Sequence, residues 1–354
     1  MPNAVLTGAI DALASHRDLS AEETERVLSE IMHGDVSETQ IAAFLIALRT
    51  KGETVDELTG LARAMRELAA HVPTTRTDLL DTAGTGGGRR TFNVSTTAAL
   101  IAAGSGCAVA KHGNRSATSS SGSADLLEAL GARIDLEPEG VARCIEQAGF
   151  GFMFAPAHHQ ATRYVVPVRR ELAVRTIFNF LGPLTNPAGA RRQLIGVSDP
   201  AFLETIAGAL ARLGVDRALV VAAEDGLDEL SVAAATKVVE VDGEELRSYT
   251  LAPQDVGVQQ FALDAFERDC AGGTPQENAA VTRAIFGGAA EVAPAARELA
   301  VINAGAAIYA GGGAASVAEG VEAARAALAG GAATEALERY VEASHANAPS
   351  GVTS

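Results

Sequence analysis

Apolar residues recur with helical spacing through the first 70 positions of the chain. Two stripes repeat every three or four residues, and their members are Ile41, Phe44, Leu45, Leu48, Leu58, Leu61 and Met65. Three capping-box patterns mark helix starts, namely Ser20 with Glu23, Ser37 with Gln40, and Thr54 with Glu57. The sequence therefore predicts an all-helical segment whose apolar faces pack on its own main domain or on a second copy of the chain.

From position 78 onward, short apolar runs alternate with helical patterns. The predicted strands include residues 79–80, 108–110, 152–154, 193–197 and 218–222, and a helical pattern covers residues 201–213. Such alternation is typical of an α/β fold with a mainly parallel sheet flanked by helices. The Val-Asp-Gly-Glu sequence at positions 241–244 predicts a hairpin, and with it an antiparallel excursion.

Composition and charge exclude several classes of function. The chain has 354 residues, is 47% hydrophobic but only 4% aromatic, and carries a formal net charge of −16. A protein this acidic lacks the basic face that nucleic acids and anionic membranes require, and we expect neither partner. Cys107, Cys144 and Cys270 are widely spaced and predict reduced thiols. Without a signal-peptide pattern or an apolar run of about 20 residues, the expected location is cytoplasmic.

Two loops rich in small residues each follow a predicted strand and lead into a helical pattern. Residues 84–88 read Gly-Thr-Gly-Gly-Gly and precede Asn-Val-Ser-Thr at 93–96, whereas residues 111–115 read Lys-His-Gly-Asn-Arg and precede a serine-rich run that ends at Asp125. Glycines, hydroxyls and free backbone N–H groups suit the binding of an anion. Ordinary turns are the structural alternative, but Lys111 at the end of an apolar strand favours a phosphate-rich ligand.

Asp228 and Glu229 form the candidate metal site. Their carboxylates are hard oxygen ligands of the kind that Mg²⁺ prefers. Taken alone, however, the pair reads more simply as a solvated acidic loop in an acidic protein. The neighbouring histidines His158 and His159 have no further ligand at zinc-binding spacing, so we expect no zinc site there.

Several long motifs, in the same order along the chain, resemble those of the anthranilate phosphoribosyltransferase family. They are the segment 111–115, Gly-Ser-Ala-Asp at 122–125, Phe-Asn-Phe-Leu-Gly-Pro-Leu-Thr-Asn-Pro at 178–187, Gly-Leu-Asp-Glu-Leu at 226–230 and Asn-Ala-Gly-Ala at 303–306. The resemblance extends nearly from end to end. It implies a helical domain over 1–72 joined by a segment near 165–190, and an α/β phosphoribosyl-binding domain over 73–345. Separately, the small and polar residues 346–354 predict a disordered tail.

The resemblance also implies a reaction, in which the phosphoribosyl group of phosphoribosyl pyrophosphate moves to the amine of anthranilate with Mg²⁺ as cofactor. It implies a homodimer formed through the helical domain. For phosphoribosyl pyrophosphate it implies binding by Gly84, Gly86, Gly87, Thr91, Asn93, Ser95, Thr96, Lys111 and Ser123. For anthranilate it implies Gly84, His112, Asn114, His159, Arg169 and Pro183, for the metal Ser95, Asp228 and Glu229, and for transition-state stabilisation Lys111 and Asn114.

The first loop departs from the family pattern. Members carry an aspartate directly after Gly-Thr-Gly-Gly, but here Gly88 is followed by Arg89 and Arg90, and the loop is one residue shorter. This change leaves open a divergent paralogue that ribosylates another aromatic carboxylate. A non-catalytic, nucleic-acid-binding relative is a further alternative, against which the acidic charge argues.

Overall fold

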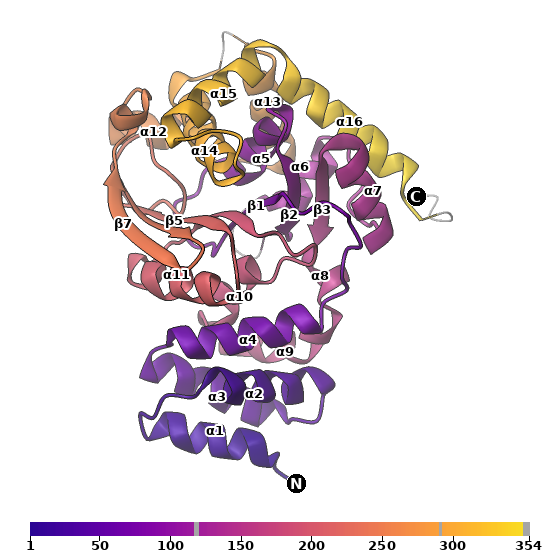
Figure 1. Ribbon diagram of the computed structural model, residues 1–354, viewed down its shortest axis with the longest axis vertical. Helices are drawn as coiled ribbons and strands as arrows, with labels where there is room; N and C mark the ends of the chain where they lie inside the picture. Colours follow the sequence, from indigo (N-terminus) through magenta and orange to yellow (C-terminus); the bar gives the residue numbers. More distant parts are fainter. Residues whose placement is uncertain (117–119, 290–291, 350–354) are drawn as a thin grey trace.

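The computed structural model describes residues 1–116, 120–289 and 292–349. A stack of helices forms one end of the molecule, and a sheet covered by helices forms the other (Figure 1). Both parts of the predicted fold class are therefore confirmed. None of the helices in these residues is both long and apolar enough to cross a membrane.

The helical end combines the N-terminal helices with a later return segment. The N-terminal helices are α1 (Ala4–Ala14), α2 (Ala21–His33), α3 (Glu38–Lys51) and α4 (Val55–Glu67). The return segment contains α8 (Ala155–His158), the 3-10 turn η1 (Gln160–Tyr164), α9 (Val166–Leu172) and α10 (Phe178–Leu184). Contacts of α9 with α3 and of α10 with α4 join the two parts. Both predicted apolar stripes are buried in this stack.

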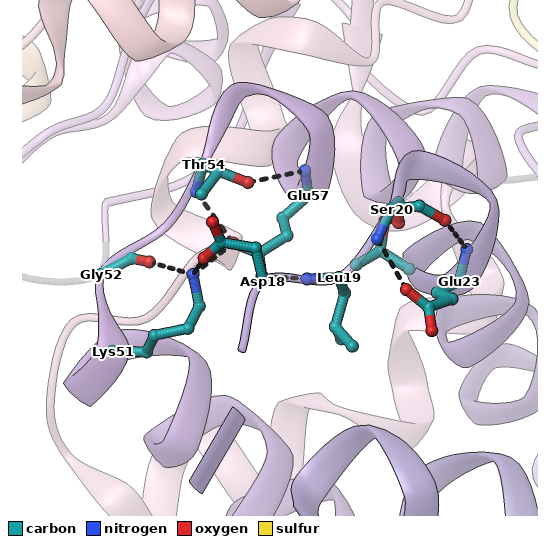
Figure 2. A network of polar contacts seen from close by, with 9 residues as sticks. Asp18, Leu19, Ser20, Glu23, Lys51, Gly52, Thr54 and Glu57 are labelled. Atoms are coloured by element: carbon teal, nitrogen blue, oxygen red, sulfur yellow. Dashed lines mark hydrogen bonds and ion pairs between the residues drawn. The ribbon is translucent and has the colours of Figure 1, made fainter. Parts of the chain in front are cut away.

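Two of the three predicted capping boxes are complete. Ser20 and Glu23 exchange both hydrogen bonds, as do Thr54 and Glu57 (Figure 2). The third prediction is only half correct. The Ser37 hydroxyl accepts from the backbone N–H of residue 40, but the side chain of that residue, Gln40, bonds to the backbone of Asn3 instead. A partner distant in sequence has thus displaced the local one.

A polar network fixes the turn between α3 and α4 (Figure 2). The Lys51 ammonium donates to Asp18 at 2.6 Å, to Glu57 at 3.0 Å and to the Gly52 carbonyl at 2.6 Å. Glu57 also accepts from the backbone N–H of Leu19 at 3.0 Å. This buried carboxylate therefore serves both its own helix cap and the loop before α2.

Within the described residues, seven strands form one sheet in the order β3-β2-β1-β4-β5-β6-β7. The first five run parallel: β1 (Leu79–Gly84), β2 (Ala108–Gly113), β3 (Phe150–Phe154), β4 (Arg192–Gly196) and β5 (Arg217–Ala223). The last two, β6 (Thr236–Asp242) and β7 (Glu245–Leu251), are antiparallel and joined at Gly243, whose φ is +59°. The predicted hairpin is confirmed.

The strand order reverses direction between β1 and β4. From β1 the chain passes through α5 (Val94–Gly104) to β2 on one side, whereas from β4 it passes through α11 (Leu203–Arg212) to β5 on the other. Loops leaving the carboxyl ends of the two strands diverge at such a point and open a crevice, which is where open α/β sheets bind ligands.

The two faces of the sheet belong to two hydrophobic cores. Leu194 and Leu219 face one core, which also contains α5 and the C-terminal helices, while Ile195 and Val220 face the other. The second core is continuous with the interior of the helical end, because α4 packs against α11. The remaining helices are α6 (Ser123–Ala129), α7 (Pro138–Ala148), α12 (Leu263–Asp269), α13 (Pro275–Phe286), α14 (Pro294–Ala310), α15 (Val317–Ala329) and α16 (Ala332–Ala346), with 3-10 turns η2 (Pro200–Phe202) and η3 (Pro253–Val256).

Specific contacts continue beyond position 346, within the predicted disordered tail. Asn347 donates to Gln147 at 3.0 Å and to the Ala343 carbonyl at 2.9 Å, and it accepts from Arg143 at 2.5 Å. These bonds hold the end of α16 against α7. Positions 350–354 of the expected tail lie outside the described residues.

Candidate active site

The first glycine loop leaves β1 at the crevice and is tied to the end of β4. The Thr85 N–H donates to the Gly196 carbonyl at 2.9 Å, and the Thr85 hydroxyl accepts from the Ser198 N–H at 3.2 Å. Gly86 and Gly87 have φ values of +65° and +88°, which side chains rarely allow. The loop therefore turns sharply, as the glycine run predicts.

A cavity of about 640 Å³ opens along this loop. Its lining includes Gly86, Gly87, Gly88, Thr91, Arg175 and Asp228. A methyl group on Gly88 would overlap the carboxylate of Asp228, so this position packs directly on the candidate metal ligand. Gly84, the last residue of β1, lies near that carboxylate too, since a methyl there would be 3.5 Å from Oδ2.

Lys111, in β2, is fully buried beneath the loop, with 1% of its surface exposed. Its ammonium donates to the Thr82 carbonyl, to the Thr82 hydroxyl at 3.1 Å and to the Ser95 hydroxyl at 3.4 Å. Burial lowers the pKa of Lys111, and the carboxylates of Asp81 and Glu229 oppose that shift. The lysine links the first strand, the start of α5 and the acidic pair.

Asp81 is a residue that motif reasoning missed. Its carboxylate accepts from the His112 N–H at 3.1 Å and from the Asn186 amide at 2.7 Å, and that amide also donates to the Ala110 carbonyl at 2.8 Å. Burial raises the pKa of Asp81 to about 6. The signal was present in the sequence, because an acid in an otherwise apolar strand is costly unless it has partners.

The acidic pair lies on the loop that follows β5, partly buried beside the first glycine loop. Burial and the neighbouring charge of Asp228 raise the pKa of Glu229 to about 8, and burial raises that of Asp228. Because the two carboxylates are difficult to ionise together, a divalent cation bound between them would stabilise their charged forms. Among the described residues no third acidic, histidine or cysteine ligand joins them.

Residues at the start of α5 take different parts. The Asn93 amide donates to the Ser121 carbonyl at 3.0 Å and accepts from Asn278 at 2.8 Å, so it ties the two glycine loops together. The Thr96 hydroxyl is buried with no hydrogen-bond partner in the described parts of the chain. Thr91 forms a bridge with Ala271 next to the cavity.

The second loop begins where β2 ends. Asn114 accepts from the Arg115 N–H at 2.7 Å, and Arg115 forms ion pairs with Asp125 at 2.7 Å and Glu128 at 2.6 Å. Ser123 is the first residue of α6 and packs near the start of this loop. Positions 117–119 of its serine-rich run lie outside the described residues.

A second cavity, of about 620 Å³, lies between this loop and the return segment. His112, Asn114, His159 and Arg169, four of the residues that the resemblance assigns to anthranilate, line it. Gly182 lines it as well, whereas Pro183 is buried within α10 and is not among the lining residues. Gly84 is likewise absent from this lining and lies on the other side, beside the acidic pair.

The two histidines of this cavity are uncharged. Burial, together with the other imidazole for His112 and with His158 for His159, lowers the pKa of His112 to about 3 and that of His159 to about 4. Their ring centroids are 5.0 Å apart, and each has a buried Nε2 atom with no partner within the described chain. Arg169 lies over the Phe178 ring at 5.5 Å and forms no ion pair among the described residues. Arg163 and Arg170 line the same cavity, so its charged groups are cationic.

Comparison with known proteins agrees with this geometry. The descriptions "Glycosyl transferase family, a/b domain" and "Glycosyl transferase family, helical bundle domain" match residues 76–334 and 7–69. Anthranilate phosphoribosyltransferases from Rubrobacter xylanophilus and Moorella thermoacetica are 51% and 47% identical to the chain. The alignments cover 96% and 95% of this chain and 98% of each relative.

Solved structures give the same result. The anthranilate phosphoribosyltransferase of Thermus thermophilus matches with a TM-score of 0.88 and 47% identity, over 95% of this chain and 99% of that one. The Saccharomyces cerevisiae enzyme, in complex with PRPP and Mg, matches with a TM-score of 0.86 and 27% identity, over 97% and 99%. This chain belongs to the anthranilate phosphoribosyltransferase family.

Proposed function

We propose that the chain transfers the phosphoribosyl group of phosphoribosyl pyrophosphate to the amine of anthranilate and releases pyrophosphate. One observation carries the proposal: two cavities of similar volume meet at the second loop. Asn114 lines the cavity that contains the two histidines, and the next residues, Arg115 and Ser116, line the cavity along the first glycine loop. A sugar carbon held at this loop would lie between a leaving group on one side and an incoming amine on the other.

On the charged side, the requirement is stabilisation of the leaving pyrophosphate as its bond to the anomeric carbon breaks. We assign the binding of phosphoribosyl pyrophosphate to backbone groups at Gly84, Gly86 and Gly87, to the side chains of Thr91, Asn93, Ser95, Thr96 and Ser123, and to Lys111. Lys111 and Asn114 would oppose the charges that develop in the transition state. Two positions support these roles: Lys111 is hydrogen-bonded to Ser95 at the start of α5, and Asn114 lines the cavity of the two histidines.

In the cavity that contains His112 and His159, the reaction requires a pocket for an aromatic acid. Arg169 suits the carboxylate because guanidinium binds it in a forked geometry. The uncharged rings of His112 and His159 suit the aromatic ring, and Pro183 would support the wall from behind. An aniline nitrogen is already neutral, so no strong general base is required.

The acidic pair fits Mg²⁺. Asp228 and Glu229 supply carboxylate oxygens and Ser95 supplies a hydroxyl, a small set that leaves room for substrate phosphates. When bound, the ion would neutralise charge on the leaving pyrophosphate.

We also propose a homodimer formed through the helical end, in the cytoplasm. Ile46 on α3 and Val166 on α9 are large apolar side chains with 37% and 42% exposure, and both lie in this part of the molecule. Sedimentation of the purified protein tests the dimer.

The decisive experiment is turnover with phosphoribosyl pyrophosphate, Mg²⁺ and a panel of aminobenzoates. We expect anthranilate to be consumed fastest, with one pyrophosphate released for each anthranilate. Faster consumption of another member of the panel would establish the divergent paralogue, to which the altered residues 88–90 point. Consumption of none would overturn the proposal.

A further inference from the structure

Arg175 lies outside every motif discussed so far. It follows α9 by three residues, just after Ala173, whose φ of +51° reverses the chain. The carbonyl of Arg175 accepts from the Arg49 guanidinium at 2.7 Å, so the end of α3 holds its backbone in place. The residue is therefore fixed at the junction between the helical end and the sheet.

Its side chain reaches over the first glycine loop. One guanidinium nitrogen donates to the Ser198 hydroxyl at 2.8 Å, and the other approaches the Thr85 carbonyl at 3.5 Å. The Ser198 hydroxyl in turn donates to the Gly86 carbonyl at 2.9 Å. A methyl group on Gly87 would overlap the guanidinium, so the loop is open at that position for this cation.

Within the described residues, the charge of Arg175 is in no ion pair. Two other arginines that line the 640 Å³ cavity are paired, Arg89 with Glu267 and Arg115 with Asp125 and Glu128. The hydrogen bonds of the Arg175 guanidinium go to neutral oxygens, and its charge lies near enough to Asp228 to oppose the rise that burial causes in the pKa of that carboxyl. A partly buried guanidinium beside a cavity at a glycine loop, with N–H donors beyond those used in these two contacts, is suited to a phosphate group.

We infer that Arg175 binds the pyrophosphate of phosphoribosyl pyrophosphate and joins it to the return segment. The inference rests on the proposed function and adds a binding residue to it. Lys111 contacts the site from the sheet and the acidic pair from the loop after β5, whereas Arg175 comes from the segment between α9 and α10. The leaving group would then be held from both ends of the molecule.

The test compares Arg175→Gln with Arg175→Lys and wild type. Calorimetry with inorganic pyrophosphate and Mg²⁺ should show affinity lower by roughly 10- to 100-fold in Arg175→Gln, since a charge-assisted hydrogen-bonding group is lost. The KM for phosphoribosyl pyrophosphate should rise similarly, while the KM for anthranilate stays within about threefold of wild type. Arg175→Lys keeps the charge and should recover part of the affinity.

Two further variants separate binding from a structural role. Ser198→Ala leaves the cation but loosens its hold, so we expect a smaller loss of pyrophosphate affinity in the same direction. Arg339→Gln removes an exposed arginine on α16, distant from the cleft, and should behave as wild type. Thermal unfolding checks each variant, and if Arg175→Gln does not fold, Arg175→Lys and Ser198→Ala carry the test.

Unchanged pyrophosphate affinity in Arg175→Gln would overturn the inference. So would equal losses for both substrates without rescue by lysine, because that outcome indicates a structural role. If wild type turns over and the variants do not differ from it, only this inference fails. If wild type binds pyrophosphate with the predicted dependence on Arg175 but transfers nothing to any aminobenzoate, only the proposed function fails.

Discussion

The two sides of the cleft have nearly equal volumes but differ in the ionisable groups that line them. The cavity along the first glycine loop, of about 640 Å³, contains Arg175 and Asp228 and lies above the buried Lys111. The cavity at the return segment, of about 620 Å³, holds two uncharged histidines, with cations at its arginine wall. The comparison teaches that size does not distinguish the half-sites, whereas the ionisation of the lining groups does.

The largest effect is expected on the charged side. Removing both carboxylates in Asp228→Ala with Glu229→Ala should lower kcat on the order of 1000-fold, because leaving-group charge loses its metal. Steady-state kinetics across Mg²⁺ concentrations measures this. Glu224→Ala, an exposed acid on the same loop, is the matched control. An active double variant with unaltered Mg²⁺ dependence would return the pair to a solvated loop.

The variant Arg169→Ala tests whether the cavity that contains the two histidines binds the acceptor. Loss of its contact with the acceptor carboxylate should cost about 2–3 kcal/mol, or roughly a 30- to 150-fold loss in kcat/KM for anthranilate. Calorimetry should find the affinity for phosphoribosyl pyrophosphate almost unaltered in the same variant. Loss of phosphoribosyl pyrophosphate binding instead would exchange the two half-sites.

The low pKa of the buried His112 has a consequence for the stability of the protein at low pH. His112 titrates near 3 when folded and near 6.5 when unfolded, so between these values the unfolded chain binds the additional proton. Wild type should therefore lose stability as pH falls below about 6.5. His112→Gln removes this contribution and should lose about 2 kcal/mol less between pH 7 and pH 5. Denaturant unfolding at both pH values measures the difference, and equal pH slopes would contradict a neutral buried imidazole.

The smallest expected effect concerns Arg89 and Arg90, which lie in the first loop where family members carry an aspartate. If Arg89 and Arg90 supplement the metal, Arg89→Ala with Arg90→Ala should weaken binding of phosphoribosyl pyrophosphate most at low Mg²⁺. The Arg89 guanidinium bonds to Glu267 and to the Asp225 carbonyl, so part of its charge is already compensated. We expect a change of about 1 kcal/mol or less. Titrations that coincide for variant and wild type at every Mg²⁺ concentration would exclude the idea.

The sequence was sufficient for the fold wherever local chemistry governs the outcome. The boxes at Ser20 and Thr54, the apolar stripes and the hairpin at Gly243 all formed as predicted. At Ser37 the prediction failed in part because Gln40 found a partner 37 residues away. Residues 178–187 are rich in residue types that favour turns, yet they contain the helix α10. This helix ends one residue after Pro183, because proline has no backbone N–H with which to continue a helix.

The site was predictable where motifs are long and not where a single side chain acts across the fold. Lys111 and Asn114 come from such a motif, whereas Arg169 lies outside the long motifs and its role follows only from the family resemblance. The three residues line or support the two cavities. The residues next to Arg175 in the sequence do not predict a binding role for it. That role depends on Ser198 and Gly87, which lie near Arg175 only in the folded chain. Asp81 is an intermediate case for prediction. Its position in an apolar strand predicts that it is buried, but the sequence does not indicate which residues bond to it.

The continuous core of the helical end and one face of the sheet has a consequence for dissecting the protein. The two family descriptions divide the chain between positions 69 and 76, but the core that includes α4 and α11 crosses that division. Cutting there would divide a core whose members on α4 and α11 include Leu58, Leu61, Ile206 and Leu210, all at most 1% exposed in the intact chain. We therefore expect neither fragment to fold alone. Shuffling of helical ends between relatives should succeed only when the surface of α11 is exchanged with them.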